Sequence, residues 1–188
     1  MTDATHAVTF DTAMFKEAVG RFVTGVTVVT ALEDEEPVGF TCQSFVSLSL
    51  DPPLVALAPA KSSTSWPRIA KAGSFCVNVL GDHQQEVCRK FAVSGGDKFA
   101  GVSWHRATGG APIIDGSLAW VNCGLELIHD AGDHELVIGR VLDLGLGEGS
   151  PLLFYKSTLS LVTEAAPAGP PEAAHNSGPH DPMPRDGT

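Results

Sequence analysis

The sequence predicts a mainly β fold, an antiparallel barrel of short strands accompanied by a few short helices. Two observations lead to this prediction. Runs rich in β-branched residues recur along the chain between glycine- and proline-containing turns, and only one segment shows strong helical periodicity. A doubly wound parallel sheet needs a helix after nearly every strand, so the scarcity of helical patterns favours antiparallel pairing.

The helical spacing lies near the N-terminus, where Phe15, Val19 and Phe22 recur at i, i+4 and i+7. This spacing predicts an amphipathic helix over 12–22, capped by Asp11 or Thr12. β-branched residues then predict three strands: one over 26–30, one over 38–50 with period-two character, and one over 54–57. A polar turn over 33–36 separates the first two, and a break at 51–53, which contains two prolines, separates the last two.

Serine and threonine residues before position 66, Pro67 and a following Gly73 predict a short helix over 62–72. The remaining segments are assigned in the same way: a buried strand over 74–80, a second short helix over 83–91, and strands over 118–128, 136–144 and 152–161.

The chain has 188 residues, which is the size of one domain with an appendage. Residues 164–188 hold six of the 13 prolines and one large apolar side chain, Met183. Such a segment cannot offset its ordering entropy by burial, so we predict a disordered Pro/Gly/Ala-rich tail there. The predicted domain covers 10–163 and follows an N-terminal extension over 1–9.

Composition excludes several classes of function. The formal net charge of −10 argues against a protein that binds duplex nucleic acid or an anionic membrane surface. No apolar run approaches the roughly 20 residues needed to span a bilayer, and residues 1–8 lack the features of a signal peptide. The four cysteines form no Cys-x-x-Cys pair, so we expect reduced, partly buried thiols in a cytoplasmic protein and no metal site.

One glycine-rich segment superficially suggests a dinucleotide loop. Residues 145–150 read Gly-Leu-Gly-Glu-Gly-Ser, but Pro151 and a strand follow where a Rossmann loop must open a helix. We therefore predict a hairpin turn at this position. The sequence also lacks a phosphate loop and a Gly-x-Ser-x-Gly elbow, so acyl transfer has no visible apparatus.

Three polar clusters interrupt the apolar pattern. The segment 41–47, Thr-Cys-Gln-Ser-Phe-Val-Ser, can hydrogen-bond the edge of a planar heterocycle, or it can be an ordinary solvent-facing strand. The segment 61–65, Lys-Ser-Ser-Thr-Ser, can cradle a phosphate at a helix start, or simply cap that helix. In Gly132-Asp133-His134, the aspartate can orient an imidazole that contacts a ligand, although a solvated turn has the same pattern. Lys98-Phe99, after the flexible segment 94–97, and Tyr155 complete the set of candidates.

Read together, these segments closely resemble the flavin reductase-like family, the short-chain flavin reductases that supply reduced flavin to partner monooxygenases. The resemblance covers nearly all of residues 10–162, in order. Its stretches are Arg21–Thr30, Gly39–Thr41 through Ser49–Val55, Phe75–Leu80, Lys98-Phe99 with Gly101–Trp104, Gly132–His134 and Pro151–Tyr155.

This resemblance implies a split β-barrel that binds FMN or FAD, usually as a homodimer with flavin near the subunit interface. It implies NADH as the hydride donor, with NADPH as the alternative, and a separate flavin-dependent monooxygenase as the partner that receives reduced flavin. It also implies that the isoalloxazine ring is contacted by Thr41, Cys42, Gln43 and Ser44, with Ser47 nearby, and that the flavin phosphate is held by Lys61, Ser62 and Thr64. By the same resemblance, the flavin is bordered by Lys98 and Phe99, and below it pack Gly25, Val26 and Thr27. The catalytic candidate is His134, beside the nicotinamide, and Tyr155 lies on the strand lining that side.

Position 43 departs from the family pattern, because it holds Gln where the family more often has Asn or Ser. Two other functions are compatible with the same barrel shape. One is a flavin- or haem-binding module without turnover, and the other is a protein–protein adaptor that uses the tail as its docking segment.

Overall fold

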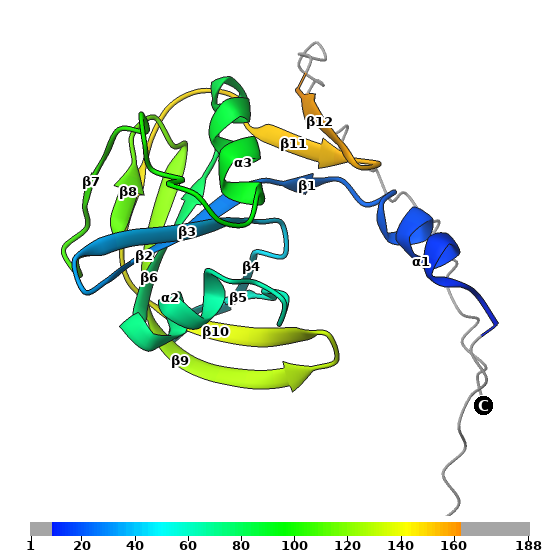
Figure 1. Ribbon diagram of the computed structural model, residues 1–188, viewed down its shortest axis with the longest axis horizontal. Helices are drawn as coiled ribbons and strands as arrows, with labels where there is room; N and C mark the ends of the chain where they lie inside the picture. Colours follow the sequence, from blue (N-terminus) through cyan, green and yellow to red (C-terminus); the bar gives the residue numbers. More distant parts are fainter. Residues whose placement is uncertain (1–8, 163–188) are drawn as a thin grey trace, which may run out of the picture.

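The computed structural model describes residues 9–162. Residues 1–8 and 163–188, which include nearly all of the predicted extension and the predicted tail, lie outside the described residues. The elements in chain order are α1 (Thr12–Val19), β1 (Thr24–Gly25), β2 (Thr27–Glu33), β3 (Glu36–Cys42), β4 (Val46–Leu50), β5 (Pro53–Leu57), α2 (Trp66–Ala72), β6 (Ser74–Val79), a 3-10 turn η1 (Asp82–Gln84), α3 (Gln85–Ala92), β7 (Trp104–Arg106), β8 (Pro112–Ile114), β9 (Ala119–Ala131), β10 (His134–Leu146), β11 (Leu152–Tyr155) and β12 (Thr158–Leu161) (Figure 1).

All of these strands pair antiparallel, which confirms the predicted mainly β, antiparallel fold. The main sheet has seven strands in the order β3-β2-β6-β9-β10-β5-β4, and smaller sheets have the orders β1-β11-β12 and β7-β8. The long hairpin of β9 and β10 contains two register shifts, which bend it and let one strand pair serve both halves of the sheet.

The main sheet curls so that its two edges meet, as the chain connectivity requires. β3 and β4 are the opposite edge strands of the seven, yet only residues 43–45 connect them (Figure 1). Three intervening residues span at most about 14 Å, so the ends of the edge strands lie close together without pairing. The result is a barrel split between β3 and β4.

Strand β2 is buried on both faces, because helices cover the sheet on either side. Side chains alternate along a strand, so Val29 and Ala31 join a first core cluster with Trp66 and Ile69 of α2. Val28 points the opposite way, into a second core cluster that includes Val26, Leu80, Phe91 and Leu152. Residues 27–31 of β2 are therefore all buried, which is typical of a central strand.

A buried amide attaches the small β7-β8 sheet to the barrel. Asn78 in β6 is fully buried and donates to the Val28 carbonyl (3.1 Å) and to Thr30 Oγ1 (3.0 Å). Its Oδ1 accepts from the backbone N–H of Ile114 in β8 (2.8 Å). Sequence patterns did not predict β7 and β8, since each strand has three residues, too few for an alternation to be read.

Several predicted element boundaries were wrong, and four of these errors change the description of an element. The helix predicted over 12–22 ends at Val19, the strand over 38–50 is interrupted by 43–45, and the helix over 62–72 begins at Trp66. The strand predicted over 152–161 divides into β11 and β12 at residues 156 and 157, both with positive φ. The glycine-rich segment after β10 is no hairpin turn either, because β10 and β11 belong to different sheets.

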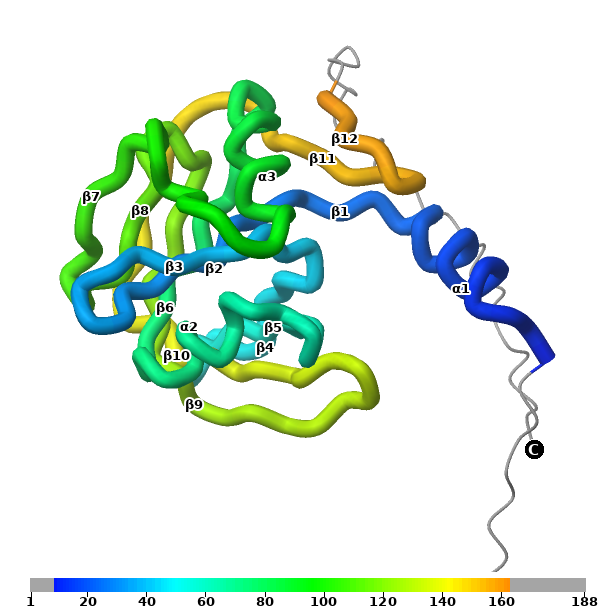
Figure 2. Tube along the Cα trace, viewed as in Figure 1, coloured from blue at the N-terminus to red at the C-terminus, as the bar shows by residue number. Residues whose placement is uncertain are grey.

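Helix α1 and the β1-β11-β12 sheet project from the barrel (Figures 1 and 2). No residue of α1 is buried, and Met14, Phe15 and Val19 expose more than half of their surface. Across residues 9–162, no helix is both long and apolar enough to cross a membrane.

Candidate functional site

A groove of about 690 Å³ opens where the barrel is split. Four segments (40–44, 58–60, 62–65 and 91–94) form its walls together with Lys98 and His134. The lining includes eight of the residues predicted from the sequence: Thr41, Cys42, Gln43, Ser44, Ser62, Thr64, Lys98 and His134. Ser63 and Ser65, which belong to the predicted cluster 61–65, also line it. Sequence reasoning missed the other lining residues: Phe40, Ala58, Pro59, Ala60, Phe91, Ala92, Val93 and Ser94.

The first wall is the connection between the two edge strands. Thr41 Oγ1 donates to the Cys88 carbonyl (2.7 Å), which ties the end of β3 to α3. Ser44 Oγ accepts from the Ala58 backbone N–H (2.8 Å), which ties the connection to the end of β5. Cys42 is buried between them, and burial raises the pKa of its thiol. Gln43 remains exposed and available to a ligand.

The second wall is the hydroxyl-rich turn 61–65, which precedes α2. The Ser63 backbone N–H donates to the Ala60 carbonyl (2.9 Å), and Ser63 Oγ accepts from the Trp66 N–H (3.1 Å). Ser62 and Thr64 stay exposed beside the groove. The predicted helical cradle is thus a turn of hydroxyl groups, since the helix begins only at Trp66.

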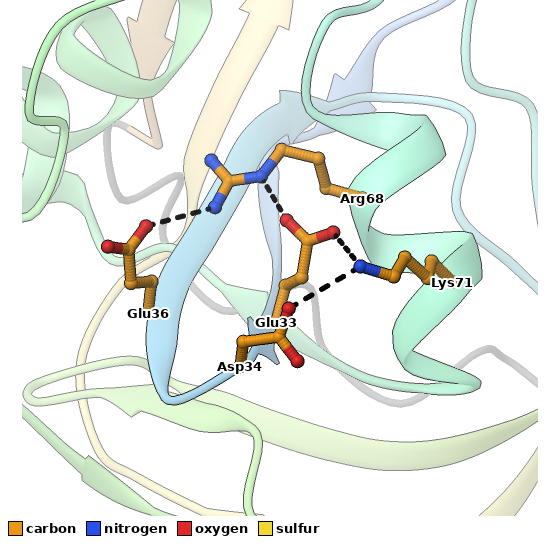
Figure 3. Close-up of polar contacts among 5 residues, drawn as sticks. All are labelled: Glu33, Asp34, Glu36, Arg68 and Lys71. Atoms are coloured by element: carbon orange, nitrogen blue, oxygen red, sulfur yellow. Dashed lines mark hydrogen bonds and ion pairs between the residues drawn. The ribbon is translucent and has the colours of Figure 1, made fainter.

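Ion pairs hold the far end of α2 against the hairpin of β2 and β3 (Figure 3). The Glu33 carboxylate accepts from Arg68 Nε (2.5 Å) and from Lys71 Nζ (3.0 Å), and both bonds lower its pKa. Lys71 also reaches Asp34 (3.4 Å), and Arg68 reaches Glu36 (3.5 Å). We call this five-residue set the α2 clamp.

Lys98 is a half-buried cation that joins three segments around the groove. Its ammonium donates to the carbonyls of Gly39 (3.1 Å) and Phe91 (3.3 Å) and to Ser65 Oγ (3.3 Å). Desolvation lowers its pKa, because no carboxylate compensates the charge among these contacts. Lys98 also lines a second groove of about 770 Å³, together with Thr64 and Ser65.

The turn of the β9-β10 hairpin forms a further side of the groove. His134 Nδ1 lies 2.7 Å from Asp133 Oδ1, which fixes the imidazole and lowers the pKa of the carboxyl. The hairpin is attached to the groove wall through backbone bonds: Lys61 N–H donates to the Asp133 carbonyl (2.9 Å), and Glu135 N–H donates to the Pro59 carbonyl (3.0 Å).

The remaining predicted residues lie outside the groove lining. Lys61 directs its ammonium to Asp130 (2.5 Å), Ser47 lies exposed in β4, and Phe99 is buried and borders the second groove. The last four lie behind the first wall or in the projecting sheet: Gly25, Val26, Thr27 and Tyr155. Of these, Thr27 Oγ1 donates to the Cys42 carbonyl (2.8 Å) and so supports the first wall from below.

The groove suits a flavin by the chemistry of its groups. Phe40, Phe91 and Pro59 supply apolar surface, the amide of Gln43 and the backbone beside it supply groups for a heterocycle edge, and Ser62 and Thr64 supply hydroxyls for an anion. A pocket with apolar walls and a few convergent polar groups is typical of a cofactor site.

Comparisons with known proteins identify the family. The flavin reductase like domain model matches residues 19–162. The reductase subunit of a flavin-dependent monooxygenase from Rhodococcus jostii is 49% identical over 154 residues, covering 81% of this chain and 79% of the relative. An FMN reductase (NADH) from Agrobacterium fabrum is 44% identical over 140 residues, covering 74% and 80%.

A solved structure has the same fold. The NADH:FAD oxidoreductase of Streptomyces globisporus, in complex with NAD and FAD fragments, superposes with a TM-score of 0.77 at 33% identity, covering 85% of this chain and 96% of that one. The chain therefore belongs to the flavin reductase like domain family and is an NAD(P)H-dependent flavin reductase.

Proposed function

We propose that this protein transfers hydride from NADH to FMN or FAD bound in the groove at the split, and that the reduced flavin then leaves for a separate monooxygenase. The observation that carries the proposal is the convergence of an apolar floor, a hydroxyl-rich turn and an oriented histidine on one groove. Flavin and nicotinamide, when bound, supply the hydride chemistry between nicotinamide C4 and flavin N5.

The protein's own task is positioning. Residues 41–44 are held by Thr41 and Ser44, so they present a fixed edge to the ring, while Ser62 and Thr64 lie where the phosphate would bind. Asp133 fixes the ring of His134, which faces the groove and orients the nicotinamide. No proton transfer by a strong acid or base is needed for this role.

The direct test measures NADH oxidation by the purified protein with FMN, FAD and riboflavin in turn. We expect stimulation by at least one flavin, and no stimulation by any of the three would contradict the proposal. Absorbance spectra of the purified protein distinguish an exchangeable flavin from a tightly held one, and a bound chromophore without NADH oxidation would favour a non-catalytic module.

A narrower test addresses His134. We expect His134→Ala to raise KM for NADH severalfold and to leave flavin binding nearly unchanged. The matched control is His105→Ala, because His105 Nδ1 lies 2.7 Å from Asp115 Oδ1 in a similar pair outside the groove lining. Unchanged NADH kinetics in His134→Ala would make the Asp133–His134 turn structural.

The proposal includes a homodimer. A single chain leaves apolar side chains exposed on α1 and β4, including Phe15, Leu48 and Leu50. Exposed apolar surface of this kind marks association sites, and the split between β3 and β4 lies beside the β4 side chains. Sedimentation of the purified protein tests this part, with a monomer as the contradicting result.

The proposed oxygenase partner is supported by the relative from Rhodococcus jostii, which is the reductase subunit of a flavin-dependent monooxygenase.

A further inference from the structure

Lys61 occupies an unusual place beside the groove. Its neighbours in the chain, Ala60 and Ser62, both line the groove, but its own ammonium extends to Asp130 Oδ2 on the β9-β10 hairpin (2.5 Å). The backbone at this point is fixed independently, because Lys61 N–H donates to the Asp133 carbonyl and Ala60 bridges His134. The side chain can therefore move without disturbing the wall of the groove.

The pair formed by Lys61 and Asp130 is inexpensive to break. The two side chains retain 38% and 80% of their exposure, and exposed ion pairs contribute little free energy because water solvates the separated charges. Asp130 depends on Lys61 more than on any other group, since the hydrogen bond from that ammonium is the main cause of its lowered pKa.

A flavin phosphate in the turn 61–65 would offer the same ammonium a second anion. Ser62 and Thr64 supply neutral hydroxyls there, and the other nearby cation, Lys98, is already bonded to two carbonyls and Ser65. Lys61 is then the one cation on this turn that can change partner by rotating its own side chain.

We propose that Asp130 competes with the flavin phosphate for Lys61, and thereby weakens the binding of phosphorylated flavins and speeds their release. This inference rests on the proposed function, which places the phosphate at residues 61–65. It assigns Asp130 a role in the exchange of flavin, although Asp130 itself lies outside the groove lining.

The experiment is a titration of flavin-free protein, followed by the quenching of flavin fluorescence, with FMN and with riboflavin, which lacks the phosphate. In low salt, Asp130→Asn is expected to lower the Kd for FMN by about two- to fivefold, which is the range for one exposed ion pair. The Kd for riboflavin is expected to stay unchanged, and the difference for FMN should shrink as salt screens the charges.

Two further variants control the result. Glu126→Gln removes the same charge from the same hairpin, but Glu126 is bonded to Arg140 (2.8 and 2.6 Å), so both flavins should bind as they do to the unmodified protein. Lys61→Met should raise the Kd for FMN, and adding Asp130→Asn to it should have no further effect.

The outcomes separate this inference from the function on which it rests. If neither flavin binds the unmodified protein, the proposed function fails. If both bind but Asp130→Asn leaves the Kd for FMN unchanged or raises it, Lys61 remains a tether to the hairpin and the competition is refuted. An equal change for riboflavin also refutes it, because the effect would then act through the shape of the groove.

Discussion

The two ends of the segment 60–72 are held to the barrel in different ways. At the C-terminal end, Ile69 lies in the first core cluster and Glu33 receives two cations of α2 at once. At the N-terminal end, Lys61 makes one exposed ion pair with Asp130. The C-terminal end therefore contributes to the stability of the fold, whereas the proposed role of the N-terminal end is to adjust the exchange of flavin.

The largest effect should come from the core at the C-terminal end. Ile69 is 1% exposed, so Ile69→Ala removes buried methyl groups and leaves a cavity under α2. We expect the free energy of unfolding to fall by about 2–4 kcal/mol, measured by urea denaturation. The control is Leu146→Ala, at a position 86% exposed, and equal losses in the two variants would contradict this view of α2.

A smaller loss is expected for Trp66→Phe. The indole Nε1–H of Trp66 donates to Glu135 Oε2 (2.5 Å), which joins the start of α2 to β10. Phenylalanine keeps most of the apolar packing but leaves the carboxylate without this donor, so the free energy of unfolding should fall by about 1–2 kcal/mol. Glu135→Gln keeps an acceptor for the indole, so its free energy of unfolding should fall less than that of Trp66→Phe. A larger fall in Glu135→Gln would show that the charge of Glu135, and not the hydrogen bond, stabilises the protein.

The α2 clamp comes third, and its effect should depend on pH. Glu33→Gln is expected to lower Tm by a few degrees, more than Glu86→Gln, which loses a single exposed pair with Arg89. The folded-state pKa of Glu33 is lowered from 4.5, so its contribution is present above that pH and is lost as pH falls through the folded value. Thermal melts of Glu33→Gln and the unmodified protein should therefore converge in acid; a constant gap would contradict the ionic origin.

The smallest effect on stability is expected at the N-terminal end. Asp130→Asn should change Tm by no more than about a degree, because the pair that it removes is exposed. The reciprocal measurement completes the comparison, since Glu33→Gln should leave the Kd for FMN nearly unchanged. A strong effect of Glu33→Gln on flavin affinity would mean that both ends position the turn.

Much of this architecture could be predicted from the sequence because local patterns determine it. The β-branched run at 26–30 predicted the strand β2, and the polar clusters at 41–47 and 61–65 contain residues of two walls of the groove. The connection at 43–45 was not predicted, although the adjacent polar residues Gln43 and Ser44 interrupt the alternation there. A short interruption of this kind does not reveal that β3 and β4 are the opposite edges of the sheet.

Partners distant in sequence were also beyond prediction. Lys61 and Asp130 are separated by 69 positions, and so are Trp66 and Glu135, so nothing local indicates either contact. The family resemblance implied that Lys61 holds the phosphate, and the structure adds the Asp130 carboxylate that the Lys61 ammonium contacts. Phe91 and Val93 were missed for another reason. Phe91 lies in the last turn of α3 and Val93 directly follows that helix, and the helical pattern does not indicate that this end of α3 reaches the groove.

The burial of all four cysteines has a consequence for the working life of the enzyme. Reduced flavin that escapes its acceptor reacts with dioxygen and yields peroxide, so a flavin reductase generates an oxidant beside its own surface. Thiolates react with peroxide, but burial raises the pKa of Cys76 and of Cys123 to about 12 and also raises the pKa of Cys42 and Cys88. The buried thiols therefore stay protonated, and protonated thiols react more slowly with peroxide than thiolates do.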